Sequence, residues 1–490
     1  MSHSLDTIFT KYPLYEATIG IEVHIQLNTK SKIFCSCANK AAQEANSNIC
    51  TICSGYPGSL PVLNKKVVDH ALLLGLATNC TITQLSTFAR KHYFYPDLPK
   101  GYQITQSDKP ICQHGFVPIV LEDGSTKKIR LNRIHMEEDA GKNIHVSENN
   151  ESFVDLNRAG TPLLEIVTEP DISSSYEARA YLKTLHTIVQ YLGISTGNME
   201  EGAFRADTNI SVKKKTATHL GTKCELKNIN SFKFISDAIE YELERQLKLI
   251  ENGESVRQET RLWDTKNKKT IVMRSKEEAA DYRYFQDPDL PLLEIQDEWI
   301  NKIRTLLPEL PHQKFERFIA QGLSAYQAEI LVDDLELANY YEETQRYTSS
   351  TLTINWILRD IMGHLKEHKI TVSECKVTPQ KLATLVELIE KGKINNRAAQ
   401  TVFEIVAQTG KEPVDVVKEQ DLEQVDSIQE LEDIVKSIIN QNPTQVADYQ
   451  AGKERLFGFF VGQTMQKTKG KGDPKIIQSL LKKYLHASQE

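Results

Sequence analysis

Residues 17–27 read Ala-Thr-Ile-Gly-Ile-Glu-Val-His-Ile-Gln-Leu, a stretch in which apolar side chains alternate with glycine or polar ones. Successive side chains of a β-strand point to opposite faces of a sheet, so this alternation predicts a strand. Ile21 and Val23 are expected on one face, and Glu22 and His24 on the other. Two neighbouring polar residues on one face are compatible with a cation site or with a solvated strand face, and the stretch alone does not choose between them.

The chain around this strand, to about Leu293, mixes short strands with helices. A cap at Ser173-Ser-Ser and a stop at Gly193 delimit one amphipathic helix, and a second is predicted from about Ser231 to Glu251. This order predicts an α+β domain over residues 1–293 in preference to a regular βαβ series. Rich in β-branched or aromatic residues, the other predicted strands are 116–121, 128–131, 152–155, 208–212 and 270–273.

Beyond the Pro288–Pro291 segment the pattern becomes helical. Thr378-Pro379 marks a helix start, and Pro413 lies in a candidate junction between two modules. We therefore expect an all-α helical domain over residues 294–410 and an all-α tail domain over residues 411–490. Three domains agree with a length of 490 residues.

Four of the eight cysteines form two close pairs, Cys35-x-Cys37 and Cys50-x-x-Cys53. Two thiol pairs across a short loop are the usual ligands of a closed tetrahedral zinc site, which is normally structural. The loop between them is small and polar, so metal binding would supply folding energy that the loop lacks. Two disulfides or four unrelated thiols are the alternatives.

The N-terminal residues and the other cysteines predict a cytoplasmic protein. Asp6, Lys11 and Glu16 interrupt the first 18 residues, so no secretory signal is recognisable, and no run of about twenty apolar residues predicts a membrane span. The remaining cysteines are isolated in the sequence, as reduced thiols usually are. A net charge of −7 argues against general polyanion binding but allows a separate basic region.

Acidic residues gather near histidines in the first domain. Glu137 and Glu138 follow His135, and Glu165 is embedded in an apolar strand, where a carboxylate must be paired, metal-bound or exposed at an edge. With His24, such oxygen ligands suit Mg²⁺ or Mn²⁺, and the surrounding Arg and Lys residues suit phosphate. The common nucleotide-binding glycine motifs are absent. On composition alone, a structural acidic surface remains the alternative to phosphoryl transfer.

Several longer strings resemble the family of B subunits of tRNA-dependent glutamyl/aspartyl amidotransferases. They occur in the family's order, cover the first 290 residues densely and continue into the C-terminal region. The strings are IGIEVH (19–24), YFYPDL (93–98), HMEEDAGK (135–142), DLNRAGTPLLE (155–165), MEEGAFRADTN (199–209), ELKNINSF (225–232), DYRYFQDP (281–288) and FGFFVGQTMQKTKGK (457–471).

The resemblance implies one subunit of a three-protein enzyme and a cradle-like catalytic domain. An amidase A subunit releases ammonia from glutamine, and a small C subunit completes the complex. The B subunit uses ATP and Mg²⁺ to phosphorylate the side-chain carboxylate of Glu-tRNA(Gln) or Asp-tRNA(Asn). Ammonia then displaces phosphate to give Gln-tRNA or Asn-tRNA.

The resemblance also assigns roles to individual residues. It implies that His24, Glu138 and Glu165 carry the catalytic Mg²⁺, with Glu22 and Glu137 supporting it, and that the four cysteines bind structural zinc. The candidates for contacts with ATP or the aminoacyl end are Asn157, Arg158, Arg205 and Lys227, the last of which has pairing with Glu225 as its alternative. For Tyr93, Tyr95 and Tyr102, base stacking and core packing both remain open.

The C-terminal basic residues Lys467, Lys469 and Lys471 are expected to contact tRNA, because the family's helical modules bind it and lysines neutralise phosphates. A non-catalytic tRNA-binding module is the rival interpretation, with the acidic clusters structural. A self-sufficient synthetase is disfavoured, because no HIGH-type or KMSKS-type signature is present.

Overall fold

The strand β1 (Tyr15–Gln26) organises the first part of the molecule. Its residues alternate strictly between buried and half-buried, with Ile21 and Val23 in the core and Glu22 and His24 on the opposite face. The predicted strand and the predicted facing of these four residues are confirmed. The computed structural model describes residues 6–42, 44–146, 151–227, 229–275, 281–424, 428–468 and 471–486.

In this described part of the chain, nine strands form one sheet in the order β14-β13-β12-β11-β1-β10-β7-β6-β2. Neighbouring strands are antiparallel except β12 and β13, which run parallel. Strands lie where the sequence predicted them at 116–121, 128–131, 208–212 and 270–273. The other strands of this sheet are β2 (Thr81–Ile82), β6 (Cys112–Val120), β7 (Thr126–Glu138), β10 (Pro162–Thr168), β11 (Phe204–Lys214), β12 (Cys224–Lys227), β13 (Glu259–Asp264) and β14 (Lys269–Ser275).

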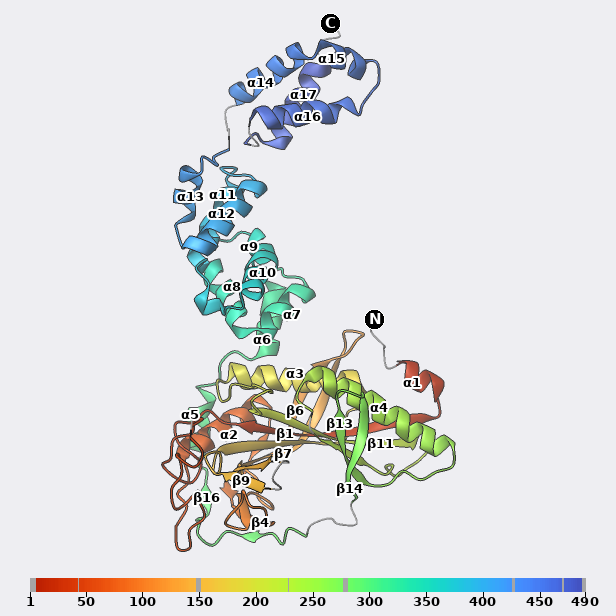
Figure 1. The fold of residues 1–490 in the computed structure, drawn as a ribbon, viewed down its shortest axis with the longest axis vertical. Coiled ribbons are helices and arrows are strands. Elements are labelled where there is room, and N and C mark those ends of the chain that lie inside the picture. Colours follow the sequence, from red (N-terminus) through yellow and green to blue (C-terminus); the bar gives the residue numbers. More distant parts are fainter. Residues whose placement is uncertain are drawn as a thin grey trace. The chain divides into compact units, whose positions relative to one another are not determined.

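Two helices cover the apolar face of this sheet (Figure 1). They are α3 (Ser175–Tyr191) and α4 (Phe232–Glu251), which lie side by side and contact β6 and β11 respectively. The Ser174 side chain accepts a hydrogen bond from the Glu177 amide, and Ser231 accepts one from the Phe234 amide, so both helices begin with a side-chain cap. The two helices predicted from the sequence are thus confirmed.

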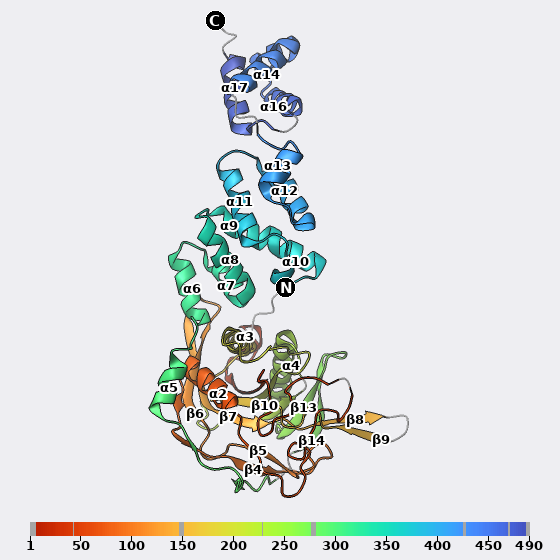
Figure 2. The ribbon, with the colours of Figure 1, turned by 90° about the vertical axis from the view of Figure 1, so that its left-hand side faces the viewer.

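The opposite face of the sheet carries smaller elements (Figure 2). A three-stranded sheet, β15-β4-β5, lies there, and β5 contacts β7. The bounds of these and the remaining elements are β3 (Leu85–Ser86), β4 (Ala89–His92), β5 (Tyr102–Thr105), β8 (Lys142–Val146), β9 (Glu151–Asp155), β15 (Phe285–Gln286), β16 (Leu293–Glu294), α1 (Asp6–Lys11), α2 (Lys65–Ala77) and α5 (Asp297–Arg304).

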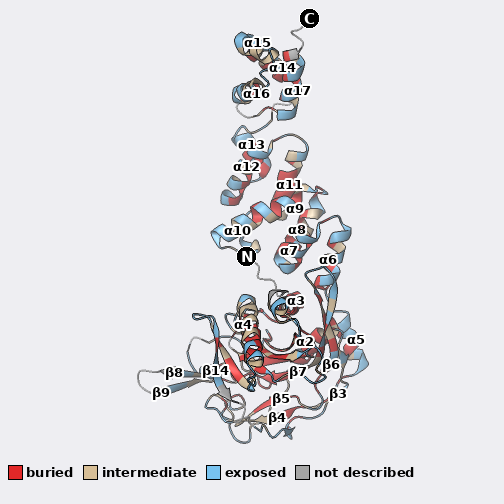
Figure 3. Cartoon of the chain, turned by 90° about the vertical axis from the view of Figure 1, so that its right-hand side faces the viewer, coloured by how far each residue is buried: buried red, intermediate tan, exposed pale blue. Residues whose placement is uncertain are grey.

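The chain divides into two compact units, Met1–Glu316 and Arg317–Glu490. The core of the first unit includes Ile300 and Ile303 of α5, and α14, α16 and α17 of the second unit share a separate apolar cluster. Figure 3 shows the buried residues of the first unit concentrated in its sheet and on the inner sides of its helices. The later elements are α6 (Pro311–Ala320), α7 (Ala325–Asp333), α8 (Leu335–Tyr347), α9 (Leu352–Trp356), a π-helical turn (Ile357–Ile361), α10 (Met362–His368), a 3₁₀ turn (Val372–Glu374), α11 (Pro379–Glu390), α12 (Asn396–Thr409), α13 (Pro413–Glu419), α14 (Ile428–Gln441), α15 (Pro443–Gln450), α16 (Leu456–Lys467) and α17 (Pro474–His486).

A sheet-rich N-terminal region followed by a helical C-terminal region agrees with the predicted α+β and all-α succession. The helix start predicted at Pro379 is confirmed, since Pro379 is the first residue of α11. At this position a backbone N–H would have no partner within the helix, so a proline, which has no N–H, loses no hydrogen bond. Of the described helices, none is long and apolar enough to cross a membrane.

Truncating the apolar side of β1 should destabilise the first unit. Ile19 is fully buried, so Ile19→Ala is expected to lower the free energy of unfolding by about 2–5 kcal/mol. Thr18→Ala, on the half-buried polar side of the same strand, is the matched control and should change it by less than about 1 kcal/mol. Urea titration followed by circular dichroism measures both; equal effects would contradict this assignment of the faces.

Candidate active site

A carboxylate between two imidazoles is the centre of the polar face of the sheet. In the strand register, Glu165 of β10 lies directly opposite His24 of β1 on one side and His135 of β7 on the other. Directly opposite residues share a face of the sheet, so the three side chains meet. The Glu165 Oε2 atom is 3.4 Å from His24 Nε2 and 3.1 Å from His135 Nε2. The sequence predicted that Glu165 must be paired, metal-bound or exposed, and the structure pairs it with a histidine on each side.

Two further carboxylates complete the group. Glu137 Oε1 is 3.6 Å from His24 Nε2, and its Oε2 atom is 3.8 Å from His135 Nε2. Glu22 Oε1 is 3.9 Å from His24 Nε2. One donor atom from each residue lies within 4.8 Å of the others in the sets Glu22, His24, Glu165 and His135, Glu137, Glu165. We call these five residues the carboxylate–imidazole cluster.

Burial and neighbouring charges shift the pKa values of three groups in this cluster, raising two and lowering one. Burial, followed by the charge of Glu165, raises the pKa of Glu22 to about 7. Burial alone would lower the pKa of His135, but the charges of Glu165 and Glu137 and the hydrogen bonds with them together outweigh it and raise the value to about 9. Burial opposes ionisation of Glu165 as well, yet His135 and His24 together hold its pKa well below the usual range. The cluster therefore retains protons near neutral pH that a bound cation would displace.

Glu138 does not join either of these sets. Its Oε1 atom accepts a hydrogen bond of 2.9 Å from the Ile104 amide and pairs with Lys100, while Gln103 Nε2 donates to its carbonyl at 2.7 Å. All three partners lie on or just before β5. Glu138 thus fixes Lys100 beside the cluster, and Glu137 is the member of the pair that faces the two histidines.

His135 and Lys91 were not among the site residues named from the sequence. His135 and Glu137 are two residues apart on one strand, which is the same spacing as Glu22 and His24, and this spacing was the available signal. Burial would lower the pKa of Lys91, but Glu137 and Glu165 are among the groups that raise it, so its ammonium is close to the cluster. Nothing local in the sequence distinguishes Lys91 from other lysines.

Arg205 and Arg158 lie at one border of the cluster. Arg205 is opposite His24 in the register of β11 and β1, and its Nη2 atom is 3.2 Å from Asp139 Oδ2. The Arg205 Nε atom is buried, and no described residue accepts its hydrogen bond. Arg158 donates to the Ala140 and Gly141 carbonyls at 3.0 and 2.6 Å. Arg158 therefore holds a turn, whereas Arg205 retains a buried donor that no described residue satisfies.

Asn157 and Lys227 are occupied by contacts within the chain. Asn157 Oδ1 accepts from the Asn48 amide at 2.8 Å, and its Nδ2 donates to the Glu44 carbonyl at 2.7 Å. Lys227 Nζ is 2.6 Å from Asp207 and 3.2 Å from Glu225, which is the pairing named as its alternative. Asn157 thus connects the segment after β9 to the loop between the two cysteine pairs.

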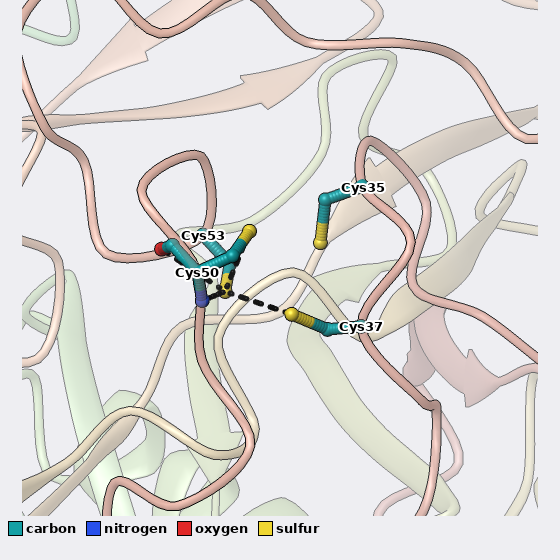
Figure 4. Close-up of side chains that lie close together, drawn as sticks. All are labelled: Cys35, Cys37, Cys50 and Cys53. Carbon is teal, nitrogen blue, oxygen red and sulfur yellow. Dashed lines mark hydrogen bonds between the residues drawn. The ribbon is translucent and has the colours of Figure 1, made fainter.

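Cys35, Cys37, Cys50 and Cys53 converge at one point (Figure 4). The Sγ atom of Cys53 is 4.0 Å from that of Cys37 and 3.8 Å from that of Cys50, and all four residues are free thiols. A tetrahedral ion with Zn–S bonds of about 2.3 Å places its sulfurs about 3.8 Å apart. The four sulfurs therefore fit zinc, and their separations are too long for the alternative of disulfides.

A buried lysine accompanies the four sulfurs. Lys32 is fully buried, and its Nζ atom is 3.6 Å from Cys53 Sγ and 3.0 Å from the Asn48 carbonyl. No carboxylate of the described residues forms an ion pair with it. Because a buried ammonium needs a counter-charge, its position favours thiolates at this centre. The hydrogen bond from Cys35 is the largest of the effects that lower the pKa of Cys53 to about 4.

The C-terminal lysines differ in exposure. Lys467 ends α16 and is exposed, whereas Lys471 is half-buried and its Nζ atom is 2.5 Å from Asp421. Lys469 lies outside the described residues.

Comparison with known proteins covers nearly the whole chain. Residues 17–301 match the family model of the GatB/GatE catalytic domain, and residues 339–485 match that of the GatB domain. The B subunit of the aspartyl/glutamyl-tRNA(Asn/Gln) amidotransferase of Geotalea daltonii is 52% identical over 476 residues, which are 96% of this chain and 99% of that protein. The protein of the same name from Syntrophotalea carbinolica is 50% identical over 473 residues, which are 96% and 98% of the two chains. The chain thus belongs to the family of aspartyl/glutamyl-tRNA(Asn/Gln) amidotransferase B subunits.

Proposed function

We propose that the chain is the subunit of a tRNA-dependent amidotransferase that activates the side-chain carboxylate of Glu-tRNA(Gln) or Asp-tRNA(Asn) with ATP and then amidates it. The relatives at about half identity over nearly full length support the amidotransferase role. The observation that carries the activation step is the buried Glu165 between His24 and His135, with Glu22 and Glu137 beside them. A carboxylate is a poor electrophile, and phosphorylation gives it a leaving group that ammonia can displace.

The carboxylate–imidazole cluster would hold Mg²⁺. Its donor chemistry fits a divalent cation, because three carboxylates gather in one place and burial with the charge of Glu165 raises the pKa of Glu22, so that this carboxyl would hold a proton until a positive charge replaces it. His24, Glu165, Glu22 and Glu137 have donors on the same face of β1, β10 and β7, and His135 adds one that the sequence interpretation lacked. When bound, Mg²⁺ would neutralise the ATP phosphates during phosphoryl transfer.

Basic side chains at the border would bind phosphate oxygens and the aminoacyl end. Arg205 is the best-supported candidate for such a contact, since its buried Nε donor has no partner among the described residues. Lys91 and Lys100 would add positive charge, and Glu138 would act by positioning Lys100. Arg158 and Asn157 would support the turn beside the site, and Lys227 would influence it through Asp207, which is opposite Glu22 in the sheet register.

The remaining assignments concern assembly and location. An amidase A subunit would supply ammonia, a small C subunit would complete a heterotrimer, and the enzyme would work in the cytoplasm. The first domain would be a cradle around the reacting groups, with a helical domain at 294–410 and a tail domain at 411–490. Exposed Lys467, with Lys469 and Lys471, would contact the tRNA backbone. Zinc at the four cysteines would be structural.

The activation step predicts a tRNA-dependent release of phosphate from ATP. In the complex with the amidase partner, Glu165→Gln should reduce release in the presence of glutamyl-tRNA(Gln) by about 100-fold or more, while tRNA affinity changes little. Glu138→Ala should also reduce it, through loss of the Lys100 position. Glu169→Gln, a half-buried carboxylate that bonds Asn132 outside the cluster, is the matched control. Wild-type rates in Glu165→Gln would favour a non-catalytic tRNA-binding module.

Cation binding should weaken as the pH falls. Below its pKa of about 7, Glu22 carries a proton that the ion must displace, so lowering the pH from 8 to 6 stabilises the cation-free state. We expect the affinity for Mn²⁺ to fall by up to about tenfold per pH unit for each proton displaced. Titration of the full chain followed by electron paramagnetic resonance measures this. An affinity independent of pH over this range would contradict the assignment of Glu22.

Loss of zinc should affect stability more than chemistry. Cys53→Ser is expected to lose about one equivalent of zinc and to lower the melting temperature of the first unit by more than about 5 °C. Cys80→Ser, a half-buried thiol outside the four-sulfur group, should retain the metal. Metal analysis and calorimetry measure both effects. Loss of phosphate release at unchanged melting temperature would mean that zinc acts directly in the reaction.

A further inference from the structure

An exposed group of aromatic rings borders the cluster. It comprises Tyr93, Phe94, Tyr95, Tyr282, Tyr284 and Phe285, which come from two segments far apart in the sequence, and we call it the aromatic platform. Ring centroids are 6.3 Å apart for Tyr93 and Tyr95, 6.4 Å for Tyr93 and Tyr282, and 6.0 Å for Tyr282 and Tyr284. The series of edge contacts therefore joins both segments into one surface.

Contacts of His92 and of β4 hold this surface in place, while four of its six rings are exposed and Tyr93 and Tyr282 are half-buried. The His92 amide donates to the Tyr282 carbonyl at 2.9 Å, the His92 ring stacks on Phe285 at 5.0 Å, and β15 pairs with β4. Phe94 is nevertheless 86% exposed and Tyr95 60% exposed. Exposed rings in a group are unusual on a protein surface and mark an interaction site.

Positive charge lies along the platform. Lys91 Nζ is 4.9 Å from the centre of the Tyr282 ring. The Arg90 guanidinium, which pairs with Asp287 and Asp289, is 5.9 Å from that of Phe285, so Lys91 is the cation available to a phosphate. Lys100, which pairs with Glu138, has its Nζ atom 5.4 Å from the centre of the Tyr102 ring. The Tyr102 ring is in turn 5.8 Å from that of His92, which stacks on Phe285, so the platform adjoins the cluster. Rings beside cations are the arrangement that binds single-stranded nucleic acid, because bases stack while lysine and arginine meet the phosphates.

We propose that the aromatic platform binds the unpaired 3′ end of the aminoacyl-tRNA by stacking its bases. This inference rests on the proposed function and extends it to a subsite. The amino acid is esterified to the last nucleotide, so a base next to the reacting carboxylate must lie beside the cluster, as the platform does.

The form of the platform favours the unpaired 3′ end of tRNA over the adenine of ATP. A single adenine needs one or two rings, whereas the platform offers rings from both segments, and Phe94, Tyr95, Tyr284 and Phe285 are each about half exposed or more. Such an open row accepts successive bases and releases them after the reaction, which suits a substrate that must leave at each turnover.

The test places the fluorescent base 2-aminopurine at the 3′-terminal position of the tRNA, or in the nucleoside triphosphate. Stacking on an aromatic ring changes its emission. With the full amidotransferase complex, the wild type should change the emission of the tRNA probe and bind intact tRNA more tightly than tRNA that lacks its last three nucleotides. Phe94→Ala combined with Tyr95→Ala should remove the emission change and reduce that preference by about tenfold. Tyr56→Ala, a ring 64% exposed elsewhere on the first unit, is the matched control.

Two other results would each overturn the inference. If the double variant loses the emission change of the triphosphate probe and keeps that of the tRNA, the platform binds the nucleotide of ATP. If it alters neither probe, the platform binds neither ligand. Wild-type phosphate release that depends on glutamyl-tRNA(Gln) would show in either case that the proposed function stands, whereas its absence would remove that function and not only the subsite.

Discussion

The burial of Glu165 between two imidazoles is the constraint on which the site depends. A carboxylate with so little exposure is tolerated because His24 and His135 reach it from the two neighbouring strands. Those contacts exist only in one register of β1, β10 and β7. A register shift of a single residue would place an apolar neighbour of Glu165 between the two histidines and would turn the polar side chains of β10 into the core. The same register therefore forms the core beneath α3 and α4 and the chemistry on the opposite face.

Features encoded by local pattern were predictable from the sequence. The two faces of β1, the serine caps of α3 and α4, and the convergence of the four cysteines all follow from spacing and residue type. The partner of Glu165 was predictable only as a requirement. Its identification as His24 and His135 depends on which strands become neighbours, and that pairing is decided by contacts between distant segments.

Asn157 illustrates why roles are harder to infer than positions. An amide and an adjacent guanidinium in a short string are equally suited to phosphate and to backbone groups, and nothing local distinguishes the two uses. In the structure, Asn157 bonds the loop between the cysteine pairs, and Arg158 bonds two carbonyls in the turn that follows β7. The loop that zinc would order is thereby joined to the turn that follows Glu137 and Glu138, so a structural metal would support the geometry of a site in which it takes no part.

Lys32 gives the four-sulfur centre a chemical sensitivity. Its buried ammonium is compatible with the interior only while negatively charged sulfur is close to it. Oxidation of the thiolates to a disulfide would remove that negative charge and leave a cation enclosed without compensation. The loop would then open to hydrate the ammonium, and through Asn157 it would release the turn beside the site. The four-sulfur centre thus makes the turn beside the carboxylate–imidazole cluster depend on sulfur that stays reduced.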